Sequence, residues 1–313
     1  AHQYLQAVNQ IDAQYHDPHV WTHDKPDSER YGLEPNFGCC TANFNQGWPK
    51  FAQNIFYLTP DDGAAVGILA PAEVALPTSA VGGGGSIVVD TTYPFEDEVR
   101  VKASAAGKGF PLYVRVPNWA AGEGGSAQLV IDGQPPVALD GKNGTLVKVG
   151  IVPAGGSLSA TLQLAPKIRI EQWAVGGYSV HRGVLMYSYP LEGNFTIVEH
   201  HYGDDDMSNT YDTTAKDAWR FALQADPTKP ADSLSYEPSG LIVGAAPFNH
   251  SNFPNTVRAT LRSLPSWGIE LGAAAEPPAS PACAKEVDCG APQSVLLVPY
   301  GMTDLRIGQF PLA

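Results

Sequence analysis

Apolar and polar residues alternate along most of the chain from residue 65 onward, in segments that are short. Gly, Pro and Asp residues separate these segments at intervals of roughly 10–15 residues. The pattern predicts antiparallel strands that form β-sandwiches, without the strand–helix alternation of a parallel sheet. The expected strands are residues 65–70, 86–92, 98–103, 112–116, 127–131, 145–149, 157–164, 179–187, 219–222, 294–299 and 305–309.

One segment, residues 41–57, has a helical period instead. Its apolar positions fall on one face of a helix: Phe44, Trp48, Phe51 and Ile55. Pro49 lies inside this run, so we expect the helix to kink or restart there. The loop that precedes the helix is rich in Pro and Gly, which excludes a continuous helix over residues 17–38.

These patterns divide the chain into three predicted parts. Residues 1–58 contain one helix and a long loop, too little to close a core. They are expected to pack against something outside this sequence or to lie across the sandwich. Residues 59–190 form a β-sandwich, and residues 191–313 form a second one or extend the first. The fold class predicted from the residues is mainly β.

Composition narrows the function classes. The 313 residues carry a formal charge of −13, and 43% of them are hydrophobic. No basic patch is available to neutralise phosphates, which argues against nucleic-acid partners and anionic membrane surfaces. No apolar run is long enough to span a bilayer. Three glycosylation sequons, at Asn143, Asn194 and Asn249, give weak support for secretion.

The four cysteines are of two kinds. Cys283 and Cys289 flank a short polar loop, and we interpret them as a local disulfide, which favours an extracellular compartment. Cys39 and Cys40 are adjacent, so a bond between them would close a strained ring. They immediately precede the predicted helix, where a thiolate is favoured and metal ligation becomes plausible. The alternative is two small buried hydrophobic residues, or one half of a disulfide.

The residues around this pair resemble a known family. The segments are Phe-Gly-Cys-Cys-Thr-Ala-Asn at 37–43, Asp-Thr-Thr-Tyr-Pro-Phe at 90–95, Phe-Pro-Leu-Tyr-Val-Arg-Val-Pro-Asn-Trp at 110–119 and His-Arg-Gly-Val-Leu-Met-Tyr at 181–187. Their order and spacing over residues 30–190 resemble the β-L-arabinofuranosidase family of glycoside hydrolases. The family has Pro-Pro where this chain has Thr41 and Ala42.

The resemblance implies a fold and a chemistry. It implies an (α/α)6 catalytic barrel followed by β-sandwiches, with residues 1–58 as the terminal segment of the barrel. Cys39 would be the nucleophile of a retaining glycosidase, and Cys40, together with Cys39, would bind zinc. The family's acid/base Glu and its remaining zinc ligands would lie N-terminal of this chain. The chain alone is therefore expected to be inactive.

These expectations combine into one interpretation and one alternative. The chain is interpreted as the C-terminal part of a secreted glycosidase that binds a glycan and associates with an N-terminal chain of the same precursor. Four residues of the loop near Cys39 are candidates for substrate binding: His16, His19, His23 and Trp21. An incomplete sequence would also leave this chain without the rest of the barrel. The alternative function is a noncatalytic carbohydrate-binding or structural β-sandwich protein with structural cysteines.

Overall fold

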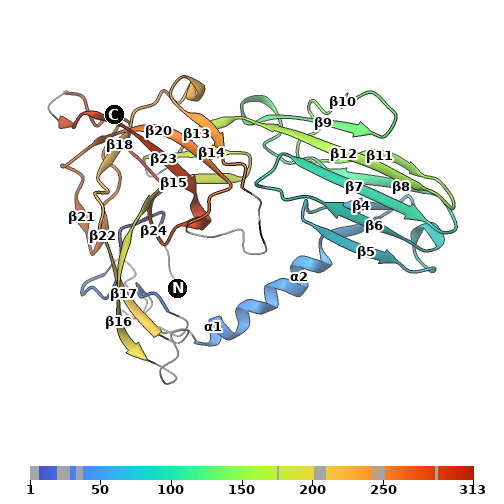
Figure 1. Cartoon of the computed structure of the whole chain (residues 1–313), viewed down its shortest axis with the longest axis horizontal. Coiled ribbons are helices and arrows are strands. Elements are labelled where there is room, and N and C mark those ends of the chain that lie inside the picture. Colours follow the sequence, from blue (N-terminus) through green and yellow to red (C-terminus); the bar gives the residue numbers. More distant parts are fainter. Residues whose placement is uncertain are drawn as a thin grey trace. The chain divides into compact units, whose positions relative to one another are not determined.

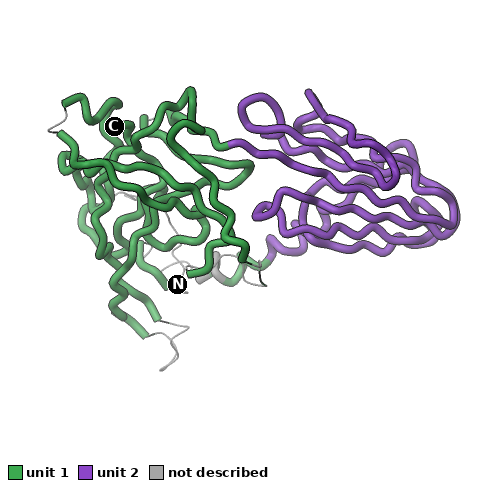
Figure 2. The backbone as a smooth tube through the Cα atoms, turned by 45° about the horizontal axis from the view of Figure 1, so that its top comes forward, with its two compact units in different colours: residues 1–45, 168–313 green, residues 46–167 purple. Residues whose placement is uncertain are grey.

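The protein divides into two compact units (Figure 2). The computed structural model describes residues 7–19, 29–32, 38–174, 176–200, 209–241, 244, 251–285 and 288–313, without the side chains of Cys40 and Thr41. Unit 1 comprises Ala1–Asn45 and Ile168–Ala313, and unit 2 comprises Gln46–Lys167. The units therefore divide the chain at 45/46 and 167/168, whereas the sequence patterns suggested 58/59 and 190/191.

Unit 2 is a β-sandwich with one sheet of six strands and one of four (Figure 1). The six-stranded sheet has the order β10 (Val137–Ala138), β9 (Gly125–Ile131), β12 (Ser157–Pro166), β7 (Glu98–Ala105), β6 (Gly85–Asp90) and β5 (Ala72–Leu76). The four-stranded sheet has the order β11 (Leu146–Val152), β8 (Phe110–Arg115), β4 (Gly63–Val66) and β3 (Phe56–Thr59). Short 3-10 turns lie at Val81–Gly83 and Gly122–Gly124.

The core of unit 2 follows from the alternation in its strands. In β7 every second residue is buried, and Val99, Val101 and Ala103 enter the same core as Leu112 and Val114 of the other sheet. A strand that is apolar on one face buries that face against the opposing sheet. Within the described part of unit 2 the strands pair antiparallel, as predicted, except that β4 runs parallel to β8.

Unit 1 is built on a larger sheet and two small ones. The large sheet has the path β1 (Asn9–Gln10), β24 (Leu305–Ile307), β15 (Leu185–Leu191), β23 (Pro292–Pro299), β20 (Asn255–Ser263) and β18 (Phe221–Leu223). Three further strands branch from it: β13 (Ile168–Gln172), β14 (Tyr178–Arg182) and β19 (Ser235–Pro238). The small sheets are β16 (Gly193–His200), β17 (Asn209–Ala215) and β2 (Asp12–Ala13), and the hairpin β21 (Ile269–Glu270)–β22 (Ala273–Ala274). Short 3-10 turns lie at Pro230–Asp232 and Tyr300–Met302.

The first residues of the chain belong to unit 1. Asn9 pairs with Ile307 of β24, β2 pairs with β17, and Tyr31 bridges to Tyr211. Ile11, Ala13 and Tyr31 are buried there. The strands β1 and β2 could not be predicted from the sequence, because two residues are too few to display a period of two. That residues 1–58 complete a helical barrel stays a prediction.

The predicted helix is present as two short helices, and it ends earlier than predicted. Helices α1 (Gly38–Asn43) and α2 (Gly47–Gln53) are joined by a 3-10 turn at Phe44–Gln46. Pro49 lies in the first turn of α2, where its missing N–H removes no intrahelical hydrogen bond. The helix ends at Gln53 rather than residue 57, because Phe56–Thr59 instead pairs with β4. Phe44 is 78% exposed and Trp48 is 66% exposed.

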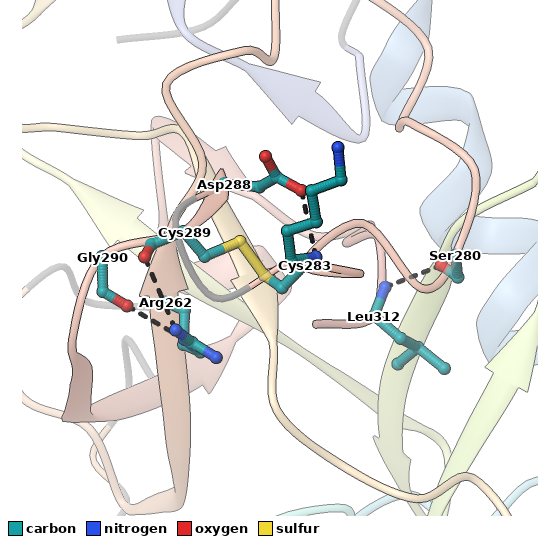
Figure 3. The surroundings of a disulfide bond; sticks show 8 residues. Arg262, Ser280, Cys283, Asp288, Cys289, Gly290 and Leu312 are labelled. Carbon is teal, nitrogen blue, oxygen red and sulfur yellow. Dashed lines mark hydrogen bonds between the residues drawn. A yellow bond between two sulfur atoms is a disulfide. The ribbon is translucent and has the colours of Figure 1, made fainter.

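The predicted disulfide joins Cys283 and Cys289 (Figure 3). Their Cα atoms are 5.5 Å apart, and the short loop between them includes a bond from Lys285 N–H to Asp288 Oδ2. Arg262 of β20 donates to the carbonyls of Cys289 and Gly290. The disulfide loop is thereby attached to the main sheet of unit 1. Among the described residues, no helix is both long and apolar enough to cross a membrane.

Truncation of a core side chain should destabilise unit 2. Leu112 has no exposed surface, so Leu112→Ala is expected to lower the free energy of unfolding of unit 2 by about 2–5 kcal/mol through lost burial and a residual cavity. Hydrogen exchange followed by mass spectrometry across a urea series, read on peptides of unit 2, measures this change. Leu58→Ala is the matched control, because Leu58 is 66% exposed; its effect should stay within about 0.5 kcal/mol. Equal effects of the two substitutions would contradict the assigned core.

Candidate functional site

Cys39 lies in the first turn of α1, and its side chain is exposed. The Asn43 side-chain amide donates to the Cys39 carbonyl over 2.6 Å, one turn along the helix. The side chain of Cys40 lies outside the described residues, although its backbone continues the same helix. The thiol of Cys39 is therefore accessible to a ligand, as a nucleophile must be.

The described residues do not form a metal site by themselves. Among them, no group of three or more His, Cys, Asp and Glu side chains is arranged to hold a metal ion. A structural zinc site needs four such ligands, and a catalytic one usually needs three. The described donors near Cys39 thus do not form a zinc site by themselves, and zinc binding by Cys39 and Cys40 stays a prediction.

Two of the predicted substrate-binding histidines lie in a cluster with two carboxylates. His16 Nε2 is 3.1 Å from Asp12 Oδ2, and His19 Nδ1 is 3.2 Å from Glu29 Oε1. Asp12 is placed by β2, and Glu29 precedes the bridge at Tyr31. The chain therefore brings these four side chains together through the short strands at its start. His23 and Trp21 lie outside the described residues.

The hairpin β21–β22 covers this cluster. Its turn, Leu271–Gly272, has positive φ at both residues. A Cβ atom on Gly272 would lie 2.2 Å from Cδ2 of His16, so only glycine allows this close approach. The cavity between the hairpin and the cluster has a volume of about 20 Å³, which is enough for a water molecule. Whether His16 and His19 contact a substrate stays a prediction.

Burial shifts the acidity of both carboxyl groups in this cluster. Desolvation raises the pKa of Asp12, and the adjacent His16 opposes the shift. Desolvation also raises the pKa of Glu29, opposed by His19 and His16, and the charge of Asp12 adds to the increase. The raised pKa values mean that both carboxyl groups hold their protons to a higher pH in the folded protein than in the unfolded chain.

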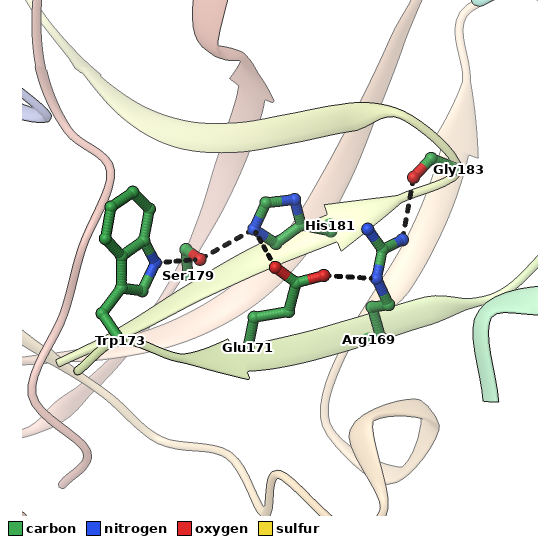
Figure 4. A network of polar contacts seen from close by, with 6 residues as sticks. All are labelled: Arg169, Glu171, Trp173, Ser179, His181 and Gly183. Carbon is green, nitrogen blue, oxygen red and sulfur yellow. Dashed lines mark hydrogen bonds and ion pairs between the residues drawn. The ribbon is translucent and has the colours of Figure 1, made fainter. Parts of the chain in front are cut away.

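A second polar network was not anticipated from the sequence (Figure 4). On β13 and β14, Ser179 Oγ is 2.7 Å from His181 Nε2, and Glu171 Oε2 is 3.5 Å from the same nitrogen. Trp173 Nε1 donates to Ser179 Oγ, and Arg169 Nε donates to Glu171 Oε1, both over 2.7 Å. Only the strand register could have revealed it, because it pairs Arg169 with His181 and Glu171 with Ser179.

This network resembles a hydrolytic triad in composition but not in geometry. A triad needs Ser and the acid on opposite nitrogens of the imidazole, whereas here both approach Nε2. Ser179 is also fully buried, so no substrate reaches its hydroxyl. Burial lowers the pKa of His181, while Glu171 opposes the shift. The network therefore links β13 to β14 and has a structural role in their pairing.

The predicted glycosylation sites are accessible where the structure describes them. Asn143 and Asn194 are both exposed, and the Asn143 amide donates to the Asn118 carbonyl over 3.1 Å. Asn249 lies outside the described residues. Exposure is a requirement for modification at a sequon. Glycosylation itself stays a prediction.

Comparison with known proteins bears on the site through unit 2. Residues 78–150 match a family model. That model describes the middle domain of GH127 β-L-arabinofuranosidases. The matched residues lie wholly within the sandwich that follows the helix of Cys39. No curated protein sequence gives a significant match to the chain.

Solved structures extend the likeness to most of the fold. A GH127 β-L-arabinofuranosidase from Geobacillus stearothermophilus T6 superposes with a TM-score of 0.54 at 15% identity over 88% of this chain. A glycoside hydrolase gives 0.56 at 18% identity over 88%, and a GH127 β-arabinofuranosidase gives 0.57 at 14% identity over 90%. These matches cover 37%, 40% and 40% of the respective structures. The chain thus has the fold of about two-fifths of such an enzyme.

The carboxylates beside His16 and His19 should give the protein a pH-dependent stability. Because burial raises the pKa of Asp12 and Glu29 in the folded state, that state retains protons that the unfolded chain has already lost. The free energy of unfolding should therefore fall as the pH rises from about 4 through the raised pKa values, with the full loss present above them. Urea denaturation at a series of pH values measures this slope.

Replacement of Glu29 by its neutral isostere Gln tests whether Glu29 contributes to this pH dependence. Glu29→Gln should flatten the decline of stability with pH, because it removes one of the two buried titrating groups. Glu276→Gln is the matched control at an exposed position of unit 1 and should leave the slope as it is. A slope that is identical in Glu29→Gln and in the unsubstituted protein would refute the role given to Glu29.

Proposed function

We propose that this chain is the C-terminal part of a retaining glycoside hydrolase that removes terminal furanose residues, such as β-L-arabinofuranose, from a glycan. The match of residues 78–150 to the GH127 middle domain carries this proposal. The fold likeness to GH127 enzymes over 88–90% of the chain supports it. The exposed Cys39 supplies a nucleophile at the segment that leads into that domain.

In the proposed reaction, Cys39 is the residue that attacks the sugar. Its thiolate Sγ forms a bond to the anomeric carbon while the bond to the leaving oxygen breaks. A carboxylic acid from the N-terminal part of the protein donates a proton to that oxygen. Water then attacks the same carbon while the resulting carboxylate takes a proton from it; the bond from that carbon to Sγ breaks, which releases the sugar with retained configuration and returns the thiolate and the carboxylic acid. Exposure of Cys39 in α1 is consistent with such an approach.

The proposal includes a zinc site whose remaining ligands come from outside the described residues. Bound to a cysteine, it would keep the thiol deprotonated near neutral pH. Cys40, with Cys39, is the donor that this chain would contribute. An N-terminal chain of the same precursor would supply the other ligands and the acid.

The helical segment offers a surface for such a partner. Trp48 and Phe51 of α2 are 66% and 40% exposed, and their rings pack edge-on with centroids 5.9 Å apart. Large apolar side chains gathered on one exposed face mark an interaction site. The disulfide between Cys283 and Cys289 is consistent with secretion of the assembled protein.

The alternative is a noncatalytic carbohydrate-binding or structural β-sandwich protein. It is favoured by the low share of helix in the chain and by the self-contained core of unit 2. In that case Cys39 and Cys40 would have no role in hydrolysis. The two functions differ in whether activity depends on the Cys39 thiol.

Replacement of Cys39 should abolish hydrolysis by the protein assembled with its N-terminal part. Cys39→Ala removes the attacking atom, so kcat for an aryl β-L-arabinofuranoside should fall by about 10³-fold or more. Stability should remain unchanged, because the side chain is exposed. Ala42→Ser, at an exposed position of the same helix, is the control and should retain full activity.

Metal content and labelling separate nucleophile from ligand in the same preparation. Cys40→Ala should lower the zinc content measured by inductively coupled plasma mass spectrometry. Iodoacetamide should label Cys39 of the intact protein and inactivate it. Full activity of Cys39→Ala would exclude the proposed nucleophile and leave the noncatalytic function.

A further inference from the structure

Unit 1 contains a cavity of about 530 Å³ that has no role in the proposed reaction. It lies where β15 ends, β16 begins and the turn at Tyr300–Met302 leads into β24. Its walls carry two aromatic side chains, Phe195 and Phe253, and three carboxylates, Glu192, Asp217 and Asp304. Its volume is within the range of sites for small ligands, about 300–1,000 Å³. Cys39, His16 and Glu29 do not line it.

Phe195 is held as a fixed platform in the wall of this cavity. The ring is 45% exposed, and its centroid lies 6.2 Å from that of Tyr31 and 6.1 Å from that of Tyr211. A Cβ atom on Gly193 would lie 3.1 Å from Cε2 of Phe195, so the ring folds back over the glycine. An aromatic ring that lines a cavity and is already restrained by its neighbours presents apolar surface to a ligand at little cost in side-chain entropy.

The polar side chains of the cavity are predominantly hydrogen-bond acceptors. Asp217 Oδ2 accepts one bond from the Glu192 backbone N–H over 2.7 Å, and a carboxylate can accept about four. Glu192 Oε1 is 2.8 Å from Lys216 Nζ, which offsets its charge. The Thr303 hydroxyl donates to the Tyr300 carbonyl and accepts from Arg306 Nε, so it is already engaged. A ligand for this cavity must therefore supply donors.

We propose that this cavity binds a saccharide residue of a glycan. One face of the sugar would lie against the Phe195 ring, and sugar hydroxyls would donate to Glu192, Asp217 and Asp304. The choice of a neutral sugar over a cationic ligand rests on the proposed function, because both classes of ligand carry donors. The cavity would then hold the glycan chain at a second point, apart from the bond that Cys39 attacks.

Saccharide binding to the full chain tests the inference directly. The probes are methyl β-L-arabinofuranoside and arabinan oligosaccharides, followed by saturation-transfer-difference NMR and by calorimetric titration. Phe195→Ala should weaken binding about tenfold through loss of the stacking face. Phe195→Tyr should keep it, because the ring remains. Ile197→Ala is the matched control, since Ile197 is similarly exposed on the same strand and does not line the cavity.

Each outcome decides between binding modes. Binding that is lost in Phe195→Ala and weakened in Asp217→Asn supports the site. Equal binding by Phe195→Ala and the unsubstituted chain overturns it, as does an absence of binding by every saccharide probe. Spermidine serves as the cationic probe: if it binds in a Phe195-dependent way and the saccharides do not, the cavity is a cation site.

The inference and the proposed function fail separately. Cys39→Ala should bind the saccharide probes as well as the unsubstituted chain does, because Cys39 is not part of the cavity. An assembled protein that is inactive toward furanosides but binds them through Phe195 would refute the proposed function alone. Hydrolysis that depends on Cys39, without saccharide binding at Phe195, would refute the second site alone.

Discussion

The two ends of the chain are joined through a buried arginine, and much of unit 1 depends on that junction. Arg306 is 1% exposed; its Nη1 donates to the Ala7 carbonyl over 2.9 Å, and its Nε donates to Thr303 Oγ1 over 2.8 Å. Beside it, the side chain of Asn9 exchanges hydrogen bonds with the backbone of Gly308 and Gln309. A guanidinium out of water is tolerated only when its donors are bonded, so these contacts hold one specific arrangement.

Two features of unit 1 depend on this junction: the cluster at Asp12 and His16, and the cavity lined by Phe195. With Asn9 fixed on β24, the chain continues directly into β2, which places Asp12 beside His16. Tyr31 returns to the same unit, donates its hydroxyl to the Asp304 carbonyl and stands against Phe195. The cluster under the hairpin and the aromatic wall of the large cavity therefore both depend on residues near the start of the chain. Loss of the junction would loosen both.

The two units differ in how much of their structure is visible in the sequence. Unit 2 has long strands with one buried face, so the alternation of Val99, Val101 and Ala103 identified the sandwich and its core. Unit 1 was less predictable. Its strand β16 is exposed along most of its length, so it lacks the alternation of a half-buried strand. Strand β20 does alternate, with Val257, Ala259 and Leu261 buried between polar neighbours, and the sequence prediction missed it.

The sequence offered candidate site residues but not their arrangement in space. The Cys39–Cys40 pair and the Cys283–Cys289 disulfide are local in sequence, and both were identified from spacing and context. His16 and His19 were selected only for their proximity to Cys39. Their partners Asp12 and Glu29 depend on short strands that pair with the far end of the chain. Contacts between residues so far apart in sequence leave no periodic signal.

The helical segment explains why assembly and chemistry would be coupled in this protein. Cys39 lies in α1, and the exposed Phe44 of the same unit follows directly after that helix. Burial of apolar surface contributes about 25 cal/mol per Å², so covering the Phe44 side chain would contribute about 1.5–3 kcal/mol to association. In the proposed enzyme, the surface that covers this side chain would also bring the acid and the remaining zinc ligands toward Cys39. The same burial that stabilises the assembled protein would then complete its active site.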